Sequence, residues 1–226
     1  MLDKSNVSTT RPIIAWDIET CPLPDELLTD VHRERIDKEV SILLQHQPDL
    51  DEDAARRLAM STHPCLGWIC CISAVAGTLD GGHRDPISLT ASSIDEENAL
   101  LEAFWDKVGR FPGSPLWVTF NGKRFDVPFV LARSAHYGVT PSRFDLANTY
   151  PYTHTPHADL YGAWPCCYTL EDMCTLLNVT SSKDGFDGSM VANAVASGRI
   201  EDVARYCEAD VVATWDCYLQ VYPFLS

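Results

Sequence analysis

The short run Leu116–Phe120 (LWVTF) limits the possible folds more than any other feature of this sequence. An apolar strand without alternating polar positions is typical of the centre of a sheet that is covered on both faces. The stretch 93–108 precedes it as an amphipathic helix, and Val127–Tyr137 follows it as a helix that Gly138 ends. This alternation of strand and helix predicts an α/β fold in which helices flank a mixed sheet.

The other segments fit the same plan. Residues 12–17 (PIIAWD) are expected to form a short buried strand that ends in an acid. The apolar runs 67–77 and 86–90 predict two strands, and the polar, glycine-containing turn 80–85 between them predicts a hairpin. After a short strand at 158–160, the periodicity predicts helices over residues 170–177, 189–196 and 200–222.

The helix expected at 93–108 has one apolar face and an acidic start. Ser93 is a candidate N-cap, and Asp95, Glu96 and Glu97 follow it. The apolar residues on the shared face are Leu100, Leu101, Phe104, Trp105 and Val108. We therefore expect this face to pack against the sheet.

Residues 23–62 differ in composition from the rest of the chain. They contain many charges, almost no aromatic residues and a helical periodicity, which predicts a helical insertion after the first strand. A chain of 226 residues is long enough for one domain with a substantial core. We expect residues 1–226 to form a single domain that includes this insertion.

The charge balance excludes one broad class of function. Seventeen basic and 32 acidic residues give a formal net charge of −15, which argues against a protein that binds nucleic acid through a generally basic surface. It leaves open a nucleic-acid enzyme whose carboxylates hold metal cations. The N-terminal residues are polar, and no apolar run approaches the roughly 18 residues of a membrane span, so we expect no membrane segment and a cytoplasmic location.

The nine cysteines are expected to be free thiols, because nothing at the N-terminus resembles a secretory signal. Two adjacent pairs lack the CxxC spacing of zinc ribbons. Packing in the core is the favoured interpretation. A zinc site stays open as an alternative, with candidate ligands Cys70, Cys71, Cys166, Cys167, His63, His154 and His157.

The first motif that indicates a chemical role is Asp17-Ile18-Glu19. Side chains alternate along a strand, so both acids lie on one face. Two carboxylates at the end of a buried strand are costly unless a cation offsets them, and Mg²⁺ prefers such oxygen ligands. The alternative is that the strand simply ends in solvent.

The second motif is the segment 121–126 (NGKRFD), which lies between the apolar strand 116–120 and a helix. Asp126 is therefore placed at the end of a central strand, the edge at which open α/β sheets bind ligands. Alternatively, Asp126 caps the helix that follows it.

The third motif is Tyr206 with Asp210, four residues apart on the predicted C-terminal helix. Positions i and i+4 lie on one helix face, so the phenol and the carboxylate point into the same space. A tyrosine that faces the core and bonds to Asp210 would explain the pair equally well.

Together, the segments DIET, NGKRFD and YCEAD resemble the three motifs of the DnaQ-like (DEDD) superfamily of 3′–5′ exonucleases. The tyrosine four residues before the last aspartate resembles the DEDDy branch. The Asn-x-x-x-Phe-Asp form of the second motif is similar to the proofreading domain of family B DNA polymerases. From Ile13 to about Tyr218, the chain resembles the stand-alone predicted exonucleases related to that domain.

This resemblance implies a ribonuclease H-like fold and phosphodiester hydrolysis with two divalent ions, Mg²⁺ or Mn²⁺. Asp17 would bind both ions, Glu19 and Asp210 would complete the first site, and Asp126 would hold the second. Tyr206 would orient the attacking water. A phenol with a usual pKa near 10 is a poor general base at neutral pH.

The resemblance also implies a substrate, the 3′ end of a nucleic acid, with single strands preferred and DNA favoured over RNA. Thr20 and Asn121 match positions that contact the terminal nucleotide. Phe125 would either stack on a base or pack beneath the site, and packing is favoured. Lys123 and Arg124 are candidates for phosphate contact.

Asp159 is an additional acid near the predicted sheet, where we expect it to support the site rather than bind metal.

Three alternatives stay open at this point: a catalytically silent binding or scaffold module of the same fold, an exoribonuclease, and an endonuclease or transposase-like enzyme. All four acids and the tyrosine are present, which favours an enzyme over a silent module. The tyrosine motif and the Asn-x-x-x-Phe-Asp context favour an exonuclease over the third alternative.

Overall fold

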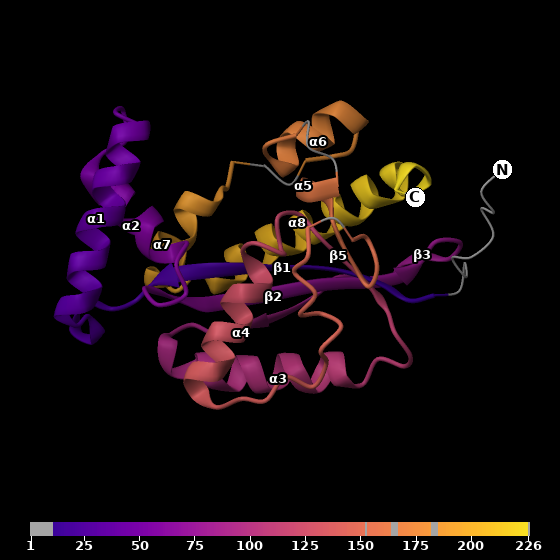
Figure 1. Ribbon diagram of the computed structural model, residues 1–226, viewed down its shortest axis with the longest axis horizontal. Helices are drawn as coiled ribbons and strands as arrows, with labels where there is room; N and C mark the ends of the chain where they lie inside the picture. Colours follow the sequence, from indigo (N-terminus) through magenta and orange to yellow (C-terminus); the bar gives the residue numbers. More distant parts are fainter. Residues whose placement is uncertain (1–10, 152, 164–166, 182–184, 226) are drawn as a thin grey trace.

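The protein has a mixed six-stranded sheet with helices on both faces (Figure 1). The computed structural model describes residues 11–151, 153–163, 167–181 and 185–225. In the order β3-β2-β1-β5-β6, β1 is antiparallel to β2 and parallel to β5, β5 is parallel to β6, and β4 also pairs with β2. The strands are β1 (Ile13–Pro22), β2 (Gly67–Thr78), β3 (Gly82–His83), β4 (Ile87–Thr90), β5 (Leu116–Thr119) and β6 (His157–Asp159).

The helices divide between the two faces of the sheet. α3 (Glu97–Gly109) and α4 (Asp126–Tyr137) cover one face, and α8 (Ile200–Val221) and α6 (Leu170–Leu177) cover the other (Figure 1). α7 (Val191–Ala196) packs beside β1, and α5 (Leu160–Ala163) follows β6 directly. The 3-10 turns are Asp25–Leu27, Ile94–Glu96, Gly188–Met190 and Tyr222–Phe224. The predicted α/β fold, a mixed sheet flanked by helices, is confirmed.

The alternation of side chains along β1 assigns each residue to one of two cores. Ile14, Trp16 and Ile18 pack in the core on the α3 and α4 side. Ile13 and Ala15 pack in the second core, with residues of α8. Because side chains alternate along a strand, Asp17 and Glu19 lie on the α8 face.

β1 is longer than predicted. It does not end at Asp17 but pairs with β2 as far as Pro22, and the register shifts between Glu19 and Thr20. The expectation of a strand end was wrong because β2 is long enough to pair with every residue of β1 from Ile13 to Pro22. Asp17 and Glu19 therefore lie inside the sheet, which also excludes a strand that simply ends in solvent.

The predicted helical insertion is present between β1 and β2. It consists of α1 (Asp30–His46) and α2 (Glu52–Ser61), which lie at one end of the sheet (Figure 1). Asp51 caps α2, since its carboxylate accepts a hydrogen bond of 2.8 Å from the Ala54 N–H. α2 buries Ala55, Ala59 and Met60 in the core and so attaches the insertion to the sheet.

α3 forms where predicted, but its start differs from the expectation. The five apolar residues of its predicted face are buried. Ser93 makes no side-chain capping bond; instead the Ser92 N–H donates to Glu96 Oε2 at 2.6 Å. Glu97 is completely buried rather than an exposed acid of the first turn.

The remaining strands also match the sequence pattern. Every residue of β5 is buried, as expected of a central strand. The predicted hairpin forms between β2 and β4, which pair in antiparallel fashion. The predicted turn between them contains the short strand β3, which also pairs with β2, and a Cβ atom on Gly77 would lie 2.1 Å from the Gly82 carbonyl oxygen. Along the described chain, no helix has both the length and the apolar composition needed to cross a membrane.

Candidate active site

Four carboxylates from three separate elements converge on the α8 side of β1. Asp17 and Glu19 come from β1, Asp126 is the first residue of α4, and Asp210 lies in α8. Burial raises the pKa of Asp17 well above its usual value, and repulsion from Asp126, Glu19 and Asp210 raises it further. Burial, followed by repulsion from Asp210, raises the pKa of Glu19 in the same way. The fold thus brings together the four acids that the sequence motifs singled out.

Asp126 is held in place by the neighbouring strand. Its side chain is 1 % exposed, and Oδ1 accepts a 3.0 Å hydrogen bond from the Ile18 N–H of β1. Burial raises the pKa of Asp126 to about 7, because it outweighs the hydrogen bonds that favour the charged form. The cap position of α4 is Phe125, which makes no side-chain capping bond, so the interpretation of Asp126 as an N-cap was wrong. Its carboxylate reaches across to β1 instead.

The loop before α4 is fixed by Asp159 at the end of β6. The Asp159 carboxylate accepts hydrogen bonds from the backbone N–H groups of Asn121 at 2.7 Å, Lys123 at 3.0 Å and Tyr161 at 3.1 Å. These bonds hold Asn121 in a left-handed conformation, with φ of 65°. Asp159 therefore stabilises the turn that delivers Asp126, which agrees with the supporting role expected from the sequence.

Lys123 makes hydrogen bonds within the protein and does not project into solvent. Its side chain is buried, and Nζ donates hydrogen bonds of 2.6 Å to the carbonyl oxygens of Tyr150 and Thr153. The expectation that Lys123 contacts phosphate was wrong, because its ammonium already bonds to backbone carbonyls of a neighbouring loop. Arg124 is exposed, and its guanidinium lies 5.6 Å from the centre of the Tyr161 ring.

Tyr206 lies beside Asp210 on the same face of α8, as the spacing predicts. Its hydroxyl is hydrogen-bonded to Asp210, and its ring lies 5.2 Å from that of Phe186. Burial raises the pKa of the Tyr206 phenol above its usual value, and the neighbouring carboxylates Asp210 and Glu19 raise it further. The phenol therefore stays protonated at neutral pH and can act as a hydrogen-bond donor.

A cavity of about 210 Å³ opens beside these side chains. Asp17, Tyr206 and Asp210 line one side of it. The other lining residues are Phe120, Thr169, Leu170, Glu171 and Thr214. The sequence motifs did not point to the start of α6, because its capping box of Thr169 and Asp172 is ordinary helix-start chemistry. Its place next to the acids follows only from the packing of α6 against α8.

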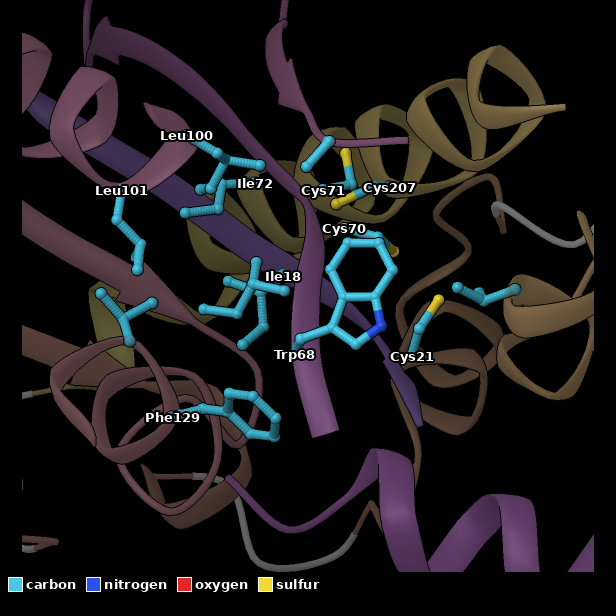
Figure 2. Close-up of a cluster of buried hydrophobic side chains, with 14 of the residues drawn as sticks. Ile18, Cys21, Trp68, Cys70, Cys71, Ile72, Leu100, Leu101, Phe129 and Cys207 are labelled. Carbon is cyan, nitrogen blue, oxygen red and sulfur yellow. The ribbon is translucent and has the colours of Figure 1, made fainter. Parts of the chain in front are cut away.

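Cys207 is a second neighbour that the motifs missed. Its Sγ lies 3.8 Å from Asp17 Oδ2, and it forms a group with Asp17 and Glu19 whose candidate ligand atoms all lie within 4.8 Å of one another. Burial raises the pKa of this thiol well above its usual value, so the sulfur is neutral. Figure 2 shows Cys207 beside Cys71, with Cys70 and Cys21 nearby in the same apolar cluster.

This arrangement bears on the alternative of a zinc site. In the described part of the chain, no group of three possible ligands forms around His63, His154 or His157. The described cysteines other than Cys65 are buried, as the packing interpretation expects. Cys166 lies outside the described residues.

The three predicted substrate contacts lie around the same region. The Thr20 hydroxyl donates a 2.7 Å hydrogen bond to the Ser61 carbonyl of α2, which links the site to the insertion. Asn121 is partly buried in its left-handed turn. Phe125 is partly buried and packs edge-on against Phe129, with 5.5 Å between the ring centres. Their roles in substrate binding stay predictions.

With this geometry established, similarity to known proteins identifies the family. Residues 63–225, well over half of the chain, match the family described as predicted 3′–5′ exonucleases related to the exonuclease domain of PolB. The chain belongs to this family. The matched region contains Asp126, Tyr206 and Asp210, whereas Asp17 and Glu19 precede it.

Similar proteins with curated descriptions are catalytic subunits of DNA polymerase epsilon. The chain is 29% identical over 141 residues to the one from Emericella nidulans, and 30% identical over 142 residues to the one from Schizosaccharomyces pombe. These matches cover 57% and 58% of the chain but only 6% of each polymerase protein. The chain therefore corresponds to a small part of these relatives.

A solved structure shows the same fold. The family B DNA polymerase from the archaeon Pyrobaculum calidifontis superposes with a TM-score of 0.63 and 18% sequence identity, over 95% of this chain and 25% of the polymerase chain. The similarity supports a mixed α/β domain of the ribonuclease H-like type.

Proposed function

We propose that this protein is a metal-dependent 3′–5′ exonuclease that hydrolyses phosphodiester bonds at the 3′ end of single-stranded nucleic acid, with DNA favoured over RNA. The observation that carries the proposal is the convergence of Asp17, Glu19, Asp126 and Asp210 beside a cavity of about 210 Å³. Among the described residues, no ion pair joins Asp17, Glu19 or Asp126 to a basic side chain.

The donor set fits hard divalent cations. Mg²⁺ and Mn²⁺ prefer carboxylate oxygens, and buried acids without a basic partner are stabilised when such a cation binds. Asp17 would contact both ions, Glu19 and Asp210 would complete the first site, and Asp126 would hold the second. A pair of divalent ions supplies charge stabilisation for the attacking and the leaving oxygen of the phosphodiester.

The protein's own groups would position the reactants. The hydrogen bond from the Ile18 N–H fixes the Asp126 carboxylate. With cations bound to the carboxylates, the single O–H of Tyr206 would donate its hydrogen bond to the attacking water in place of Asp210 and orient that water, since its raised pKa makes it a poor base at neutral pH. Tyr206 and Asp210 line the cavity from the same helix face, so the water and the scissile phosphate would meet there.

The substrate would enter as a single strand. A chain with a net charge of −15 gains little from general attraction to phosphate, and separating a paired end costs a few kcal/mol. We propose that Thr20 and Asn121 contact the terminal nucleotide, and that Phe125 packs beneath it. A single domain over residues 1–226 and a cytoplasmic location stay predictions.

A catalytically silent module of the same fold is the alternative function. The presence of all four acids together with Tyr206 favours the enzyme, because a silent module has no need to keep acids that repel one another together.

One assay tests the proposal directly. Single-stranded DNA and RNA, labelled at the 5′ end in one set and the 3′ end in another, are incubated with the purified protein and Mg²⁺ or Mn²⁺. We expect a ladder that shortens from the 3′ end, faster for DNA than for RNA, and slower for blunt duplex at matched salt. Excess EDTA should abolish it. Robust hydrolysis in EDTA would contradict the metal-dependent mechanism, and no hydrolysis with either metal would favour the silent module.

A further inference from the structure

A second and larger cavity lies on the opposite face of the sheet. It has a volume of about 710 Å³ and lies between α3 and the sheet, next to the first half of β1. Ile14 and Trp16 line it, and both face away from the side of β1 that carries Asp17. The cavity is therefore separate from the candidate active site.

Small side chains on β2 create this space. Ala74 and Ala76 line the cavity where longer residues would fill the gap between the sheet and α3, and Gly77 follows them. Ile72 lies earlier on the same face of β2 and also lines the cavity, but its side chain is larger than those of the two alanines. Drug-sized ligands occupy cavities of about 300–1,000 Å³ that are mainly apolar, and this cavity falls within that range.

Aromatic and aliphatic side chains form the floor of the cavity. They are Ile14, Trp16, Phe104, Val108 and Trp117, with Phe111 at the end of α3.

The rim is basic although the protein as a whole is strongly acidic. Arg84 and Lys107 line opposite sides, the first next to β3 and the second on α3, and neither has an ion-pair partner within the described ranges. Arg110 is paired with Asp106 at 2.7 Å. His83 and Asp85 complete the rim, so one acid accompanies these basic residues.

We propose that this cavity binds an amphipathic organic anion, a small molecule with an apolar body and one acidic group. The apolar body would lie over Ala74, Ala76 and Phe111, which line the cavity and are partly exposed. The acidic group would lie at the rim, where Arg84 and Lys107 provide charges that no acidic side chain of the described protein neutralises. The concave shape and the volume fit a small molecule.

Titration of the full-length protein with the fluorescent dye 8-anilinonaphthalene-1-sulfonate tests this proposal, because the dye combines an aromatic body with one sulfonate. We expect saturable binding at one site per chain, with quenching of tryptophan fluorescence. Decanoate should displace the dye, and decanol should do so at least tenfold less well. The double variant Arg84→Glu/Lys107→Glu should weaken binding by tenfold or more.

Two further variants separate the cavity from the rest of the surface. Ala76→Leu fills the cavity and should abolish dye binding while the melting temperature stays equal or rises. Lys38→Glu, an exposed charge change on α1, should leave binding unchanged, and so should Asp17→Asn in the candidate active site. If Ala76→Leu fails to fold, the rim variant still decides the question.

Three outcomes would overturn the proposal. They are the absence of saturable binding, equal binding by wild type and the rim variant, and displacement of the dye by decanol as readily as by decanoate. Because Asp17→Asn should bind the dye normally, a failure here is distinguishable from a failure of the proposed nuclease activity.

Discussion

Buried carboxylates occur in two parts of this protein, and their surroundings differ in one respect. Glu97, on the α3 side of the sheet, is surrounded by donors. Asp126, on the α8 side, is also buried, but it lies beside the partly buried acids Asp17, Glu19 and Asp210, and these acids repel one another. The difference teaches that burial of an acid does not by itself indicate function, whereas the gathering of several mutually repelling acids at one place does.

The groups around Glu97 compensate the negative charge of its carboxylate. Its carboxylate accepts hydrogen bonds from the Ile69 N–H at 2.7 Å, from Arg133 Nε at 2.9 Å and from the Tyr137 hydroxyl at 3.0 Å. Arg133 is itself buried and pairs with Glu97 a second time through Nη2 at 2.5 Å. This cluster joins α3, α4 and β2, so its role is structural.

The largest expected effect is a loss of hydrolysis when one of the four acids is replaced. We expect Asp17→Asn and Asp210→Asn to lower the rate of hydrolysis on the order of a thousandfold or more, because a charged ligand of the cations is lost. Neither variant should melt at a lower temperature in metal-free buffer, since repulsion among the acids is relieved. Asp216→Asn, farther along α8, is the matched control. Near wild-type turnover in both active-site variants would show that the site is assigned wrongly.

The second effect concerns Glu97. Glu97→Ala leaves Arg133 buried without its partner, and we expect a loss of about 3–5 kcal/mol in the free energy of unfolding. Denaturant unfolding of this variant and of Glu102→Ala, an exposed position on α3, measures the difference. The rate per folded molecule should stay close to wild type. If Glu97→Ala were as stable as the Glu102→Ala control, the two clusters would not differ as described.

The third effect is a dependence of stability on pH in the absence of metal. Burial raises the pKa of Asp126 to about 7, so the folded protein holds this proton more tightly than the unfolded chain does. Stability from this group is complete below the unfolded pKa, near pH 4, and is lost as the pH rises toward about 7. We expect the melting temperature in EDTA to fall across this range.

Metal should reverse this trend, because cations bind the ionised acids. At neutral pH, Mg²⁺ or Mn²⁺ should raise the melting temperature of the wild type and have less effect on Asp17→Asn. Thermal melts from pH 4 to 8, with and without metal, provide the measurement. A melting temperature in EDTA that rose steadily from pH 4 to 7 would contradict the assignment of Asp126 as an uncompensated acid.

The smallest expected effect is on the rate of hydrolysis when Tyr206 is replaced. Tyr206→Phe removes one hydrogen bond to the attacking water and should slow hydrolysis by about ten- to a hundredfold, or about 1–3 kcal/mol. The melting temperature should change little, because the ring still packs against Phe186. Tyr206→His should keep partial activity. An unchanged rate with a lower melting temperature in Tyr206→Phe would instead identify Tyr206 as a packing residue that bonds to Asp210.

Local periodicity was enough to predict much of the fold. The alternation along β1 placed Asp17 and Glu19 on one face, and the spacing of four residues placed Tyr206 and Asp210 on another. The same kind of pattern predicted the buried face of α3 and the helical character of the insertion. These features depend on residues close in sequence, whose geometry is fixed by the backbone of a single strand or helix.

Contacts between distant segments were decided only by the tertiary structure. The sequence showed Glu97 as one of three acids at a helix start, and only the packing of α4 against α3 brings Arg133 to it. Likewise, Lys123 looked like an exposed loop cation, but the carbonyls of Tyr150 and Thr153 lie where its ammonium ends.

The same distinction applies within the candidate site. The sequence by itself determined which residues carry the acids and which face of their own strand or helix each one occupies. Only the tertiary structure decided that the Asp126 carboxylate reaches the Ile18 N–H and that Cys207 lies against Asp17. The physical reason is that a local pattern fixes the direction of a side chain relative to its own backbone, whereas its partner is chosen by how whole elements pack.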